Sequence, residues 1–185
     1  GLIGITTEET PDISSPGDHV SITDSEMALR YSVARLRLKG INKIIVMSHS
    51  GSYKDFELAK TVSGIDVIVG GHDNQLFSNT NEKADYPYPV VETAPDGKPV
   101  LVVQAYAYSR YLGALEVTFD DDGVAKAWSG EPITLDASIK PAEDVLAKIA
   151  EVSGAVDAIR TVEVGSFTTA ADGSRESCRA MECAM

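Results

Sequence analysis

Two histidines stand at the ends of apolar, strand-like runs. His49 follows the run at residues 44–48, and His72 follows the run at residues 65–71. The chain has only three histidines. The third, His19, lies after Pro-Gly-Asp in a predicted loop, and we interpret it as a surface residue. Because imidazole at a strand end is a good ligand for zinc or a similar metal, the pattern predicts that His49 and His72 form half of a metal site.

Asn74 extends this half site. It lies two residues after His72 and offers a carbonyl oxygen, a harder ligand than imidazole. Asparagine is also common in turns, which is its alternative role here. Glycines at positions 51, 70 and 71 leave room for the backbone to approach a compact site. A dinuclear hydrolytic site also needs carboxylates, and we find none at the end of the first predicted strand.

The elements around the histidines follow a strand–helix–strand pattern. Helices are predicted between residues 23 and 40, beginning in a capping box at residues 23–26, and from residue 52 through residue 62. Strands are predicted at residues 1–7, 43–47, 65–69 and 100–104. Strand–helix–strand units with short links are parallel, and their ligands bind at the carboxyl ends of the strands. His49 and His72 both lie at such ends.

The rest of the chain adds a hairpin and a helix. A long loop is predicted at residues 79–98, and residues 120–123 give a strong hairpin signal between strands at 112–119 and 124–128. A helix is predicted at residues 141–160 and a last strand at residues 161–168, before a small, polar stretch that begins at residue 170. The fold class is therefore α/β, with βαβ units and a β-hairpin region.

Composition limits the classes of function. The 185 residues carry a formal net charge of −12, which disfavours binding to nucleic acid. No apolar run approaches the roughly 20 residues that span a bilayer.

The chain begins without Met and shows no signal peptide, so we expect it to be processed or cut from a longer chain. Cys178 and Cys183 are close in sequence, and their spacing leaves free thiols and a short disulfide equally open.

Several motifs together resemble one family. G-G-H-D-N at residues 70–74 resembles the G-G-H-[SD]-[NQ] motif of secreted 5'-nucleotidases in the calcineurin-like metallophosphoesterase superfamily. S-H-S-G at residues 48–51 resembles the family's G-H-S-G, with Ser48 in place of the usual glycine. Further matches cover residues 1–11, 102–113 and 172–183. The chain thus resembles the second half of the metal-binding domain.

The resemblance implies roles for individual residues. His49 and His72 match two ligands of one metal in a dinuclear pair of divalent ions, zinc or manganese, and Asn74 matches a ligand of the other metal. Arg179 matches an arginine that binds the substrate phosphate, which suits the fork of a guanidinium group. Cys178 and Cys183 match a family disulfide. No catalytic residue falls in the chain, because the family's catalytic His-Asp dyad and bridging Asp match nothing here and are expected before Gly1.

We therefore expect a truncated metallophosphatase sandwich from a periplasmic or secreted 5'-nucleotidase. Residues 1–168 would be the C-terminal half of the metallophosphoesterase domain, and residues 169–185 would begin a linker to a nucleotide-binding domain. The parent enzyme would hydrolyse nucleoside 5'-monophosphates to nucleoside and phosphate. The isolated chain is expected to be inactive, and an exposed sheet edge would favour self-association or pairing with the missing half of the domain.

Two classes of alternative function remain open. The first stays in the same superfamily and comprises 2',3'-cyclic nucleotide phosphodiesterases, UDP-sugar hydrolases and thiosulfohydrolases. The second is a non-catalytic binding module that kept the sheet and lost the metals. Zinc binding that does not change when His49 or His72 is replaced by alanine would favour the binding module.

Overall fold

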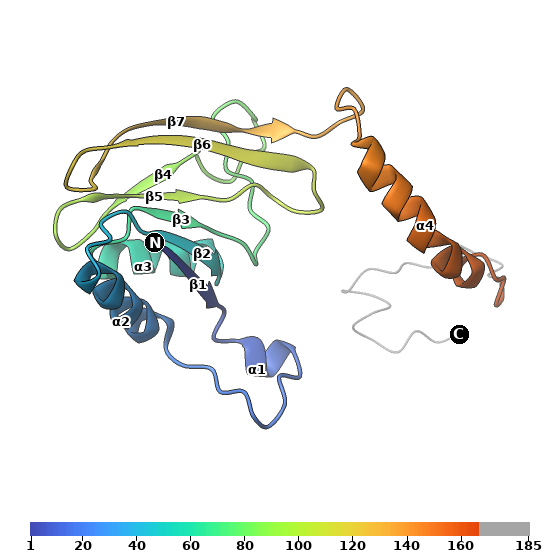
Figure 1. The fold of residues 1–185 in the computed structure, drawn as a ribbon, viewed down its shortest axis with the longest axis horizontal. Coiled ribbons are helices and arrows are strands. Elements are labelled where there is room, and N and C mark those ends of the chain that lie inside the picture. Colours follow the sequence, from blue (N-terminus) through green and yellow to red (C-terminus); the bar gives the residue numbers. More distant parts are fainter. Residues whose placement is uncertain (167–185) are drawn as a thin grey trace. The chain divides into compact units, whose positions relative to one another are not determined.

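A five-stranded sheet with the strand order β1-β2-β3-β5-β4 organises the computed structural model (Figure 1). Strands β1, β2, β3 and β5 are parallel, and β4 pairs antiparallel with β5 at one edge. The strands are β1 (Leu2–Thr6), β2 (Ile45–His49), β3 (Val67–Val69), β4 (Val90–Thr93) and β5 (Pro99–Val103). The chain divides into two compact units, Gly1–Ser138 and Ile139–Met185, and the structure describes residues 1–166.

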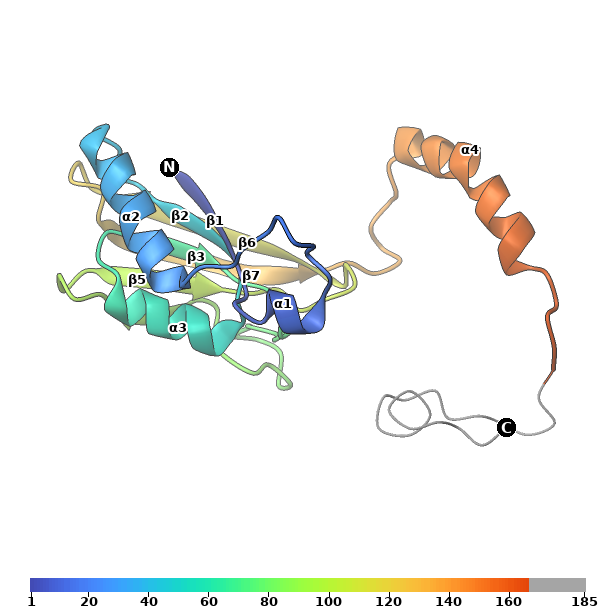
Figure 2. The ribbon, with the colours of Figure 1, turned by 90° about the horizontal axis from the view of Figure 1, so that it is seen from below.

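Helices α2 (Ser25–Leu38) and α3 (Ser52–Thr61) cover one face of this sheet (Figure 2). One row of paired strand residues, Ile3, Val46, Ile68 and Val102, faces the helices and is buried. Leu29 and Val33 of α2 and Leu58 of α3 pack in the same core cluster. Each helix connects two parallel strands, so the predicted βαβ units are confirmed.

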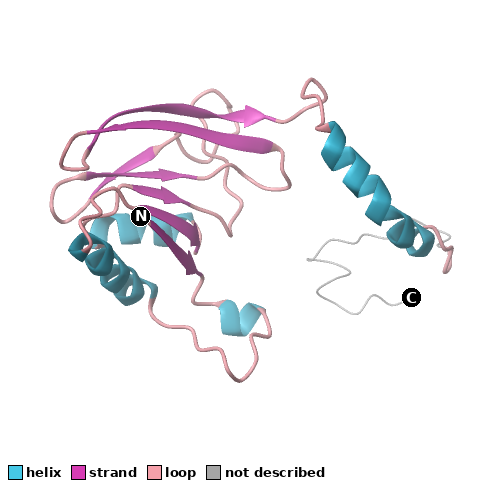
Figure 3. Cartoon of the chain, viewed as in Figure 1, coloured by secondary structure: helices cyan, strands magenta, loops and turns pink. Residues whose placement is uncertain are grey.

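A hairpin of β6 (Tyr111–Phe119) and β7 (Ala125–Thr134) packs on the opposite face of the sheet (Figure 3). Leu115, Val117 and Ala125 of the hairpin contact Val67 and Leu101 of the sheet. The hairpin leaves part of this face uncovered, because Leu2 is 69% exposed and Met47 is 58% exposed. The fold is thus a mixed α/β structure with helices on one face of the sheet and a hairpin over part of the other.

Some predicted elements differ from the structure. The predicted loop after β1 contains a short helix, α1 (Thr10–Ile13), and the predicted long loop at residues 79–98 contains β4. The cap of α2 is Asp24, which accepts a hydrogen bond from the Met27 N–H at 2.7 Å, rather than Thr23. Glu26 does not reach back to the cap, because it pairs with Arg30 instead.

The second unit contains α4 (Glu143–Arg160), which confirms the predicted helix. The predicted strand at residues 161–168 is wrong for residues 161–166, which follow the helix as a turn and irregular backbone. None of the helices in the described part of the chain combines the length and hydropathy needed to cross a bilayer.

Candidate metal site

The two predicted histidines meet at the carboxyl edge of the sheet. His49 is the last residue of β2, and His72 follows β3 after two glycines. Since Met47 of β2 pairs with Val69 of β3 in the parallel ladder, the segments that follow these two strands leave the sheet at the same edge. The centroids of the two imidazole rings lie 5.2 Å apart, and their planes meet at 71°. The structure therefore brings these side chains together on one side of the sheet edge.

This separation fits two imidazoles that share one metal ion. Zinc lies about 2.0–2.1 Å from a histidine nitrogen, and a tetrahedral angle between two such ligands places the ring centroids about 5 Å apart. Within residues 1–166, no group of three or more His, Cys, Asp or Glu side chains is arranged to hold a metal. Among the described residues, the two imidazoles are therefore a pair of candidate ligands.

Asn74 lies in the loop that follows His72. Asn74 is exposed, and its side chain makes no hydrogen bond to another residue of the described segment. His72 and Asn74 both have positive backbone φ angles, 87° and 58°. Non-glycine residues rarely adopt this conformation, and they cluster at functional sites where the surroundings hold them.

A carboxylate that sequence reasoning missed also reaches the histidines. Glu9 Oε2, in the loop after β1, lies 3.5 Å from His72 Nε2. The parallel register could have indicated this, because Thr6 of β1 pairs with His49 and the loop after β1 therefore starts beside the site. Glu9 lies three residues after the end of β1, so the expectation that no carboxylate ligand stands at the strand end itself stays a prediction.

Asp55 of α3 is a buried acid that contacts Ser48, the residue before His49. Its Oδ1 accepts a hydrogen bond from Ser48 Oγ at 2.5 Å, and its Oδ2 is buried with no hydrogen-bond partner among the described residues. Burial, with a smaller contribution from the nearby charge of Asp73, raises the pKa of Asp55 to about 7 against the lowering effect of the hydrogen bond from Ser48. Helical spacing could have identified this residue, because Asp55 shares the buried face of α3 with Leu58 and Ala59.

Asp73, between the two candidate ligands, connects their loop to α3. Its Oδ2 accepts hydrogen bonds from the Ser52 N–H at 2.8 Å and from the Ser52 hydroxyl. Burial acts to raise the pKa of Asp73, but the hydrogen bonds from Ser52 and Gln104 outweigh it, so the pKa lies below its ordinary value. Asp73 therefore stays ionised and holds the first turn of α3.

Three residues that the sequence singled out, Arg179, Cys178 and Cys183, lie outside the described residues.

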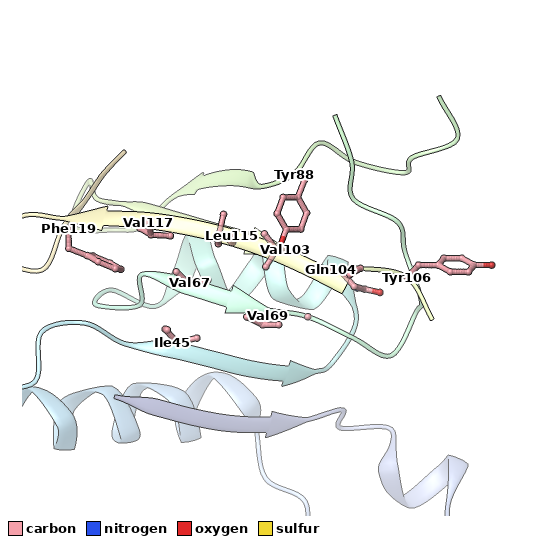
Figure 4. A pocket seen from close by; sticks show the side chains of 13 residues that line it. Ile45, Val67, Val69, Tyr88, Val103, Gln104, Tyr106, Leu115, Val117 and Phe119 are labelled. Carbon is pink, nitrogen blue, oxygen red and sulfur yellow. The ribbon is translucent and has the colours of Figure 1, made fainter. Parts of the chain in front are cut away.

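A cavity of about 620 Å³ lies between the sheet and the hairpin (Figure 4). It is lined mainly by apolar side chains, among them Ile45, Val67, Val69, Val103, Leu115, Val117 and Phe119. Polar side chains of Tyr88, Gln104 and Tyr106 also line it.

Comparison with known proteins finds similarity to 5'-nucleotidases in both sequence and fold. The chain is 40% identical to a snake venom 5'-nucleotidase of Naja atra, over 99% of this chain and 35% of the relative. A crystal structure of a 5'-nucleotidase precursor from Thermus thermophilus superposes with a TM-score of 0.80 at 40% identity, over 87% of this chain and 32% of that one.

A calcineurin-like phosphoesterase from Bacillus subtilis shares the fold, with a TM-score of 0.64 at 22% identity, over 86% of this chain and 52% of that one. No family model matches the chain. The chain spans about a third of the length of the 5'-nucleotidases that it matches. These comparisons confirm the resemblance to the 5'-nucleotidase family and the metallophosphoesterase fold.

Proposed function

We propose that this chain provides two histidine ligands of the metal centre of a 5'-nucleotidase, which hydrolyses nucleoside 5'-monophosphates to nucleoside and phosphate. The observation that carries the proposal is the ring-to-ring placement of His49 and His72 at a parallel sheet edge. That placement occurs in a chain that is 40% identical to a 5'-nucleotidase over nearly its whole length.

In this proposal His49 and His72 hold one divalent ion, zinc or manganese, and Asn74 contributes to a second. Such ions polarise phosphoryl oxygens and lower the pKa of a bound water toward 7. The task of this chain is to keep both imidazoles oriented and close together at the sheet edge. The family resemblance supports Arg179 as the group that steadies the substrate phosphate.

The resemblance also supports a Cys178–Cys183 disulfide and a periplasmic or secreted location. The disulfide and this location are linked, because disulfides form and persist in oxidising compartments such as the periplasm and the extracellular space. The snake venom relative is consistent with a secreted protein. Residues 1–168 are proposed as metallophosphoesterase domain and residues 169–185 as the start of a linker.

We expect the 185-residue chain by itself to have little phosphatase activity, because two imidazoles leave a metal ion short of ligands. Strand β1 is an edge strand of the sheet. Its unpaired backbone groups favour self-association or pairing with further strands of the same domain. A monomeric, metal-free preparation of the chain that hydrolyses AMP would contradict this expectation.

A chimera tests the function directly. The segment of the Thermus thermophilus 5'-nucleotidase that aligns with this chain is replaced by the chain, and phosphate release from AMP is measured with added Zn²⁺ or Mn²⁺. We expect hydrolysis that is lost in the His49→Ala and His72→Ala chimeras and kept in His19→Ala. Hydrolysis that survives both ligand substitutions would overturn the proposal and favour a role without metal for this chain.

A further inference from the structure

The side chain of Gln104 contacts the residues on both sides of Asn74. Gln104 directly follows β5 and is 3% exposed. Its Nε2 donates to Asp73 Oδ1 at 2.8 Å, and its Oε1 accepts from the Gln75 backbone N–H at 2.6 Å. One buried amide therefore fixes the backbone and side-chain groups that flank a candidate metal ligand.

Asp73 also hydrogen-bonds to the segment that follows His49. While its Oδ1 accepts from Gln104, its Oδ2 accepts from the N–H and hydroxyl of Ser52, the first residue of α3. Ser52 comes three residues after His49 along the chain. The connections therefore run from the end of β5, through Asp73, to the segment that leaves β2 at His49.

The loop needs such support because of its backbone. His72 and Asn74 both lie in the left-handed region, with φ angles of 87° and 58°. Asparagine tolerates this conformation, whereas a φ of 87° at His72 is uncommon for a residue other than glycine and persists where surrounding contacts determine it. Gln104 hydrogen-bonds to Asp73, which lies between these two positions, and to the backbone of Gln75, which directly follows them.

We infer that Asp73 and Gln104 are positioning residues, a polar clamp that holds His72 and Asn74 in the orientation needed to bind metal. The inference rests on the proposed metal site. Outer groups that orient the ligands of a metal change its affinity by about 10–100-fold when they are replaced. The clamp is built from complementary partners, since the amide N–H faces a carboxylate and the amide oxygen faces a backbone N–H.

This complementarity permits a rescue experiment with the full chain. In Asp73→Asn, a new amide N–H faces the N–H group of Gln104. In Gln104→Glu, a second carboxylate faces Asp73. The double variant Asp73→Asn/Gln104→Glu restores a donor opposite an acceptor. In that variant the amide oxygen at position 73 still accepts from Ser52, and the carboxylate at position 104 still accepts from the Gln75 N–H.

Two measurements follow each variant. Co²⁺ is titrated as a spectroscopic probe of the metal site, and backbone amide exchange is measured at residues 72–75 without metal. We expect each single variant to weaken Co²⁺ binding about tenfold or more and to speed exchange at Gln75, and the double variant to recover both.

Glu131→Gln serves as the matched control. Glu131 of β7 holds another loop by accepting from Ser78, Asn79 and Thr80. We expect this substitution to leave Co²⁺ binding and exchange at residues 72–75 unchanged.

The outcomes separate the clamp from the proposed function. If the unaltered chain does not bind Co²⁺, its two imidazoles are too few to hold the ion without the rest of the site, and amide exchange alone then decides whether Asp73 and Gln104 hold the loop. Unchanged exchange at residues 72–75 in both single variants would overturn the clamp. So would single variants that bind Co²⁺ like the unaltered chain, or a double variant that recovers neither property.

Discussion

Gly71 lies directly against the imidazole of His49. A Cβ atom at position 71 would be 3.2 Å from His49 Nδ1 and 3.4 Å from the carbonyl oxygen of Ser48. The glycine comes from the segment after β3, and the histidine comes from the end of β2. A side chain at position 71 would therefore push apart the two segments that the site needs close together.

Gly71→Ala should weaken Zn²⁺ binding by about tenfold, because a small displacement of one ligand is enough to spoil a metal site. The measurement is calorimetric titration of the chain with Zn²⁺. Gly4→Ala on β1 is the control, since a Cβ there meets nothing within 4 Å. Equal Zn²⁺ affinities for the two variants would show that Gly71 is not needed to place His49.

Asp55 makes the stability of the chain depend on pH. Its pKa in the folded chain is about 7, against an ordinary value of 3.8. Between these values the folded chain holds a proton that the unfolded chain has lost, so the free energy of unfolding falls as pH rises through this range. The full loss, reached above pH 7, is on the order of 4 kcal/mol.

Asp55→Asn should remove this part of the pH dependence, because asparagine is neutral and its oxygen still accepts from Ser48. Urea unfolding at about pH 5 and about pH 8 measures it. We expect the variant to gain stability relative to the unaltered chain as pH rises. A difference between variant and unaltered chain that is the same at both pH values would contradict a raised pKa for Asp55.

The covered and uncovered faces of the sheet predict a contrast between two leucines. Leu58 of α3 is fully buried in the main core, whereas Leu2 of β1 is 69% exposed. Leu58→Ala should lower the free energy of unfolding by about 2–5 kcal/mol, the usual cost of a cavity in a core. Leu2→Ala should change it by less than about 1 kcal/mol. Urea unfolding of both variants checks the assignment of the two faces, and similar losses would contradict it.

Glu9 should support metal binding through His72. Its carboxylate oxygen lies 3.5 Å from His72 Nε2 and can orient the imidazole ring. Glu9→Gln should lower Zn²⁺ affinity about tenfold, while the neighbouring Glu8→Gln should not, because Glu8 faces α2 and accepts from the Ser25 N–H. Unchanged Zn²⁺ affinity in Glu9→Gln would show that this contact has no role at the site.

The parallel strands and the histidine pair were predictable from sequence because both are encoded locally. Short β-branched runs between capped helices predicted the βαβ units, and the rule that ligands bind at strand carboxyl ends brought His49 and His72 together. Strand β4 was not predicted from the sequence, because its residues lie among prolines and polar residues and because its pairing with β5 decides its conformation.

The supporting contacts of the site were not predictable in the same way. Asp73 and Gln104 are 31 positions apart, and their hydrogen bond depends on how β3 and β5 lie side by side. The cap of α3 likewise comes from Asp73, not from a neighbour in sequence. Local patterns identified the candidate ligands, whereas the groups that orient them come from distant strands.

The central claim is that His49 and His72 hold the same metal ion, and Zn²⁺ calorimetry of a double-mutant cycle tests it most directly. The variants are His49→Ala, His72→Ala and the double substitution, with the exposed His19→Ala as control. We predict that either single substitution removes the binding event, that the double substitution adds no further loss, and that His19→Ala binds like the unaltered chain. Two independent losses that add in the double variant would place the histidines on separate ions and contradict the account.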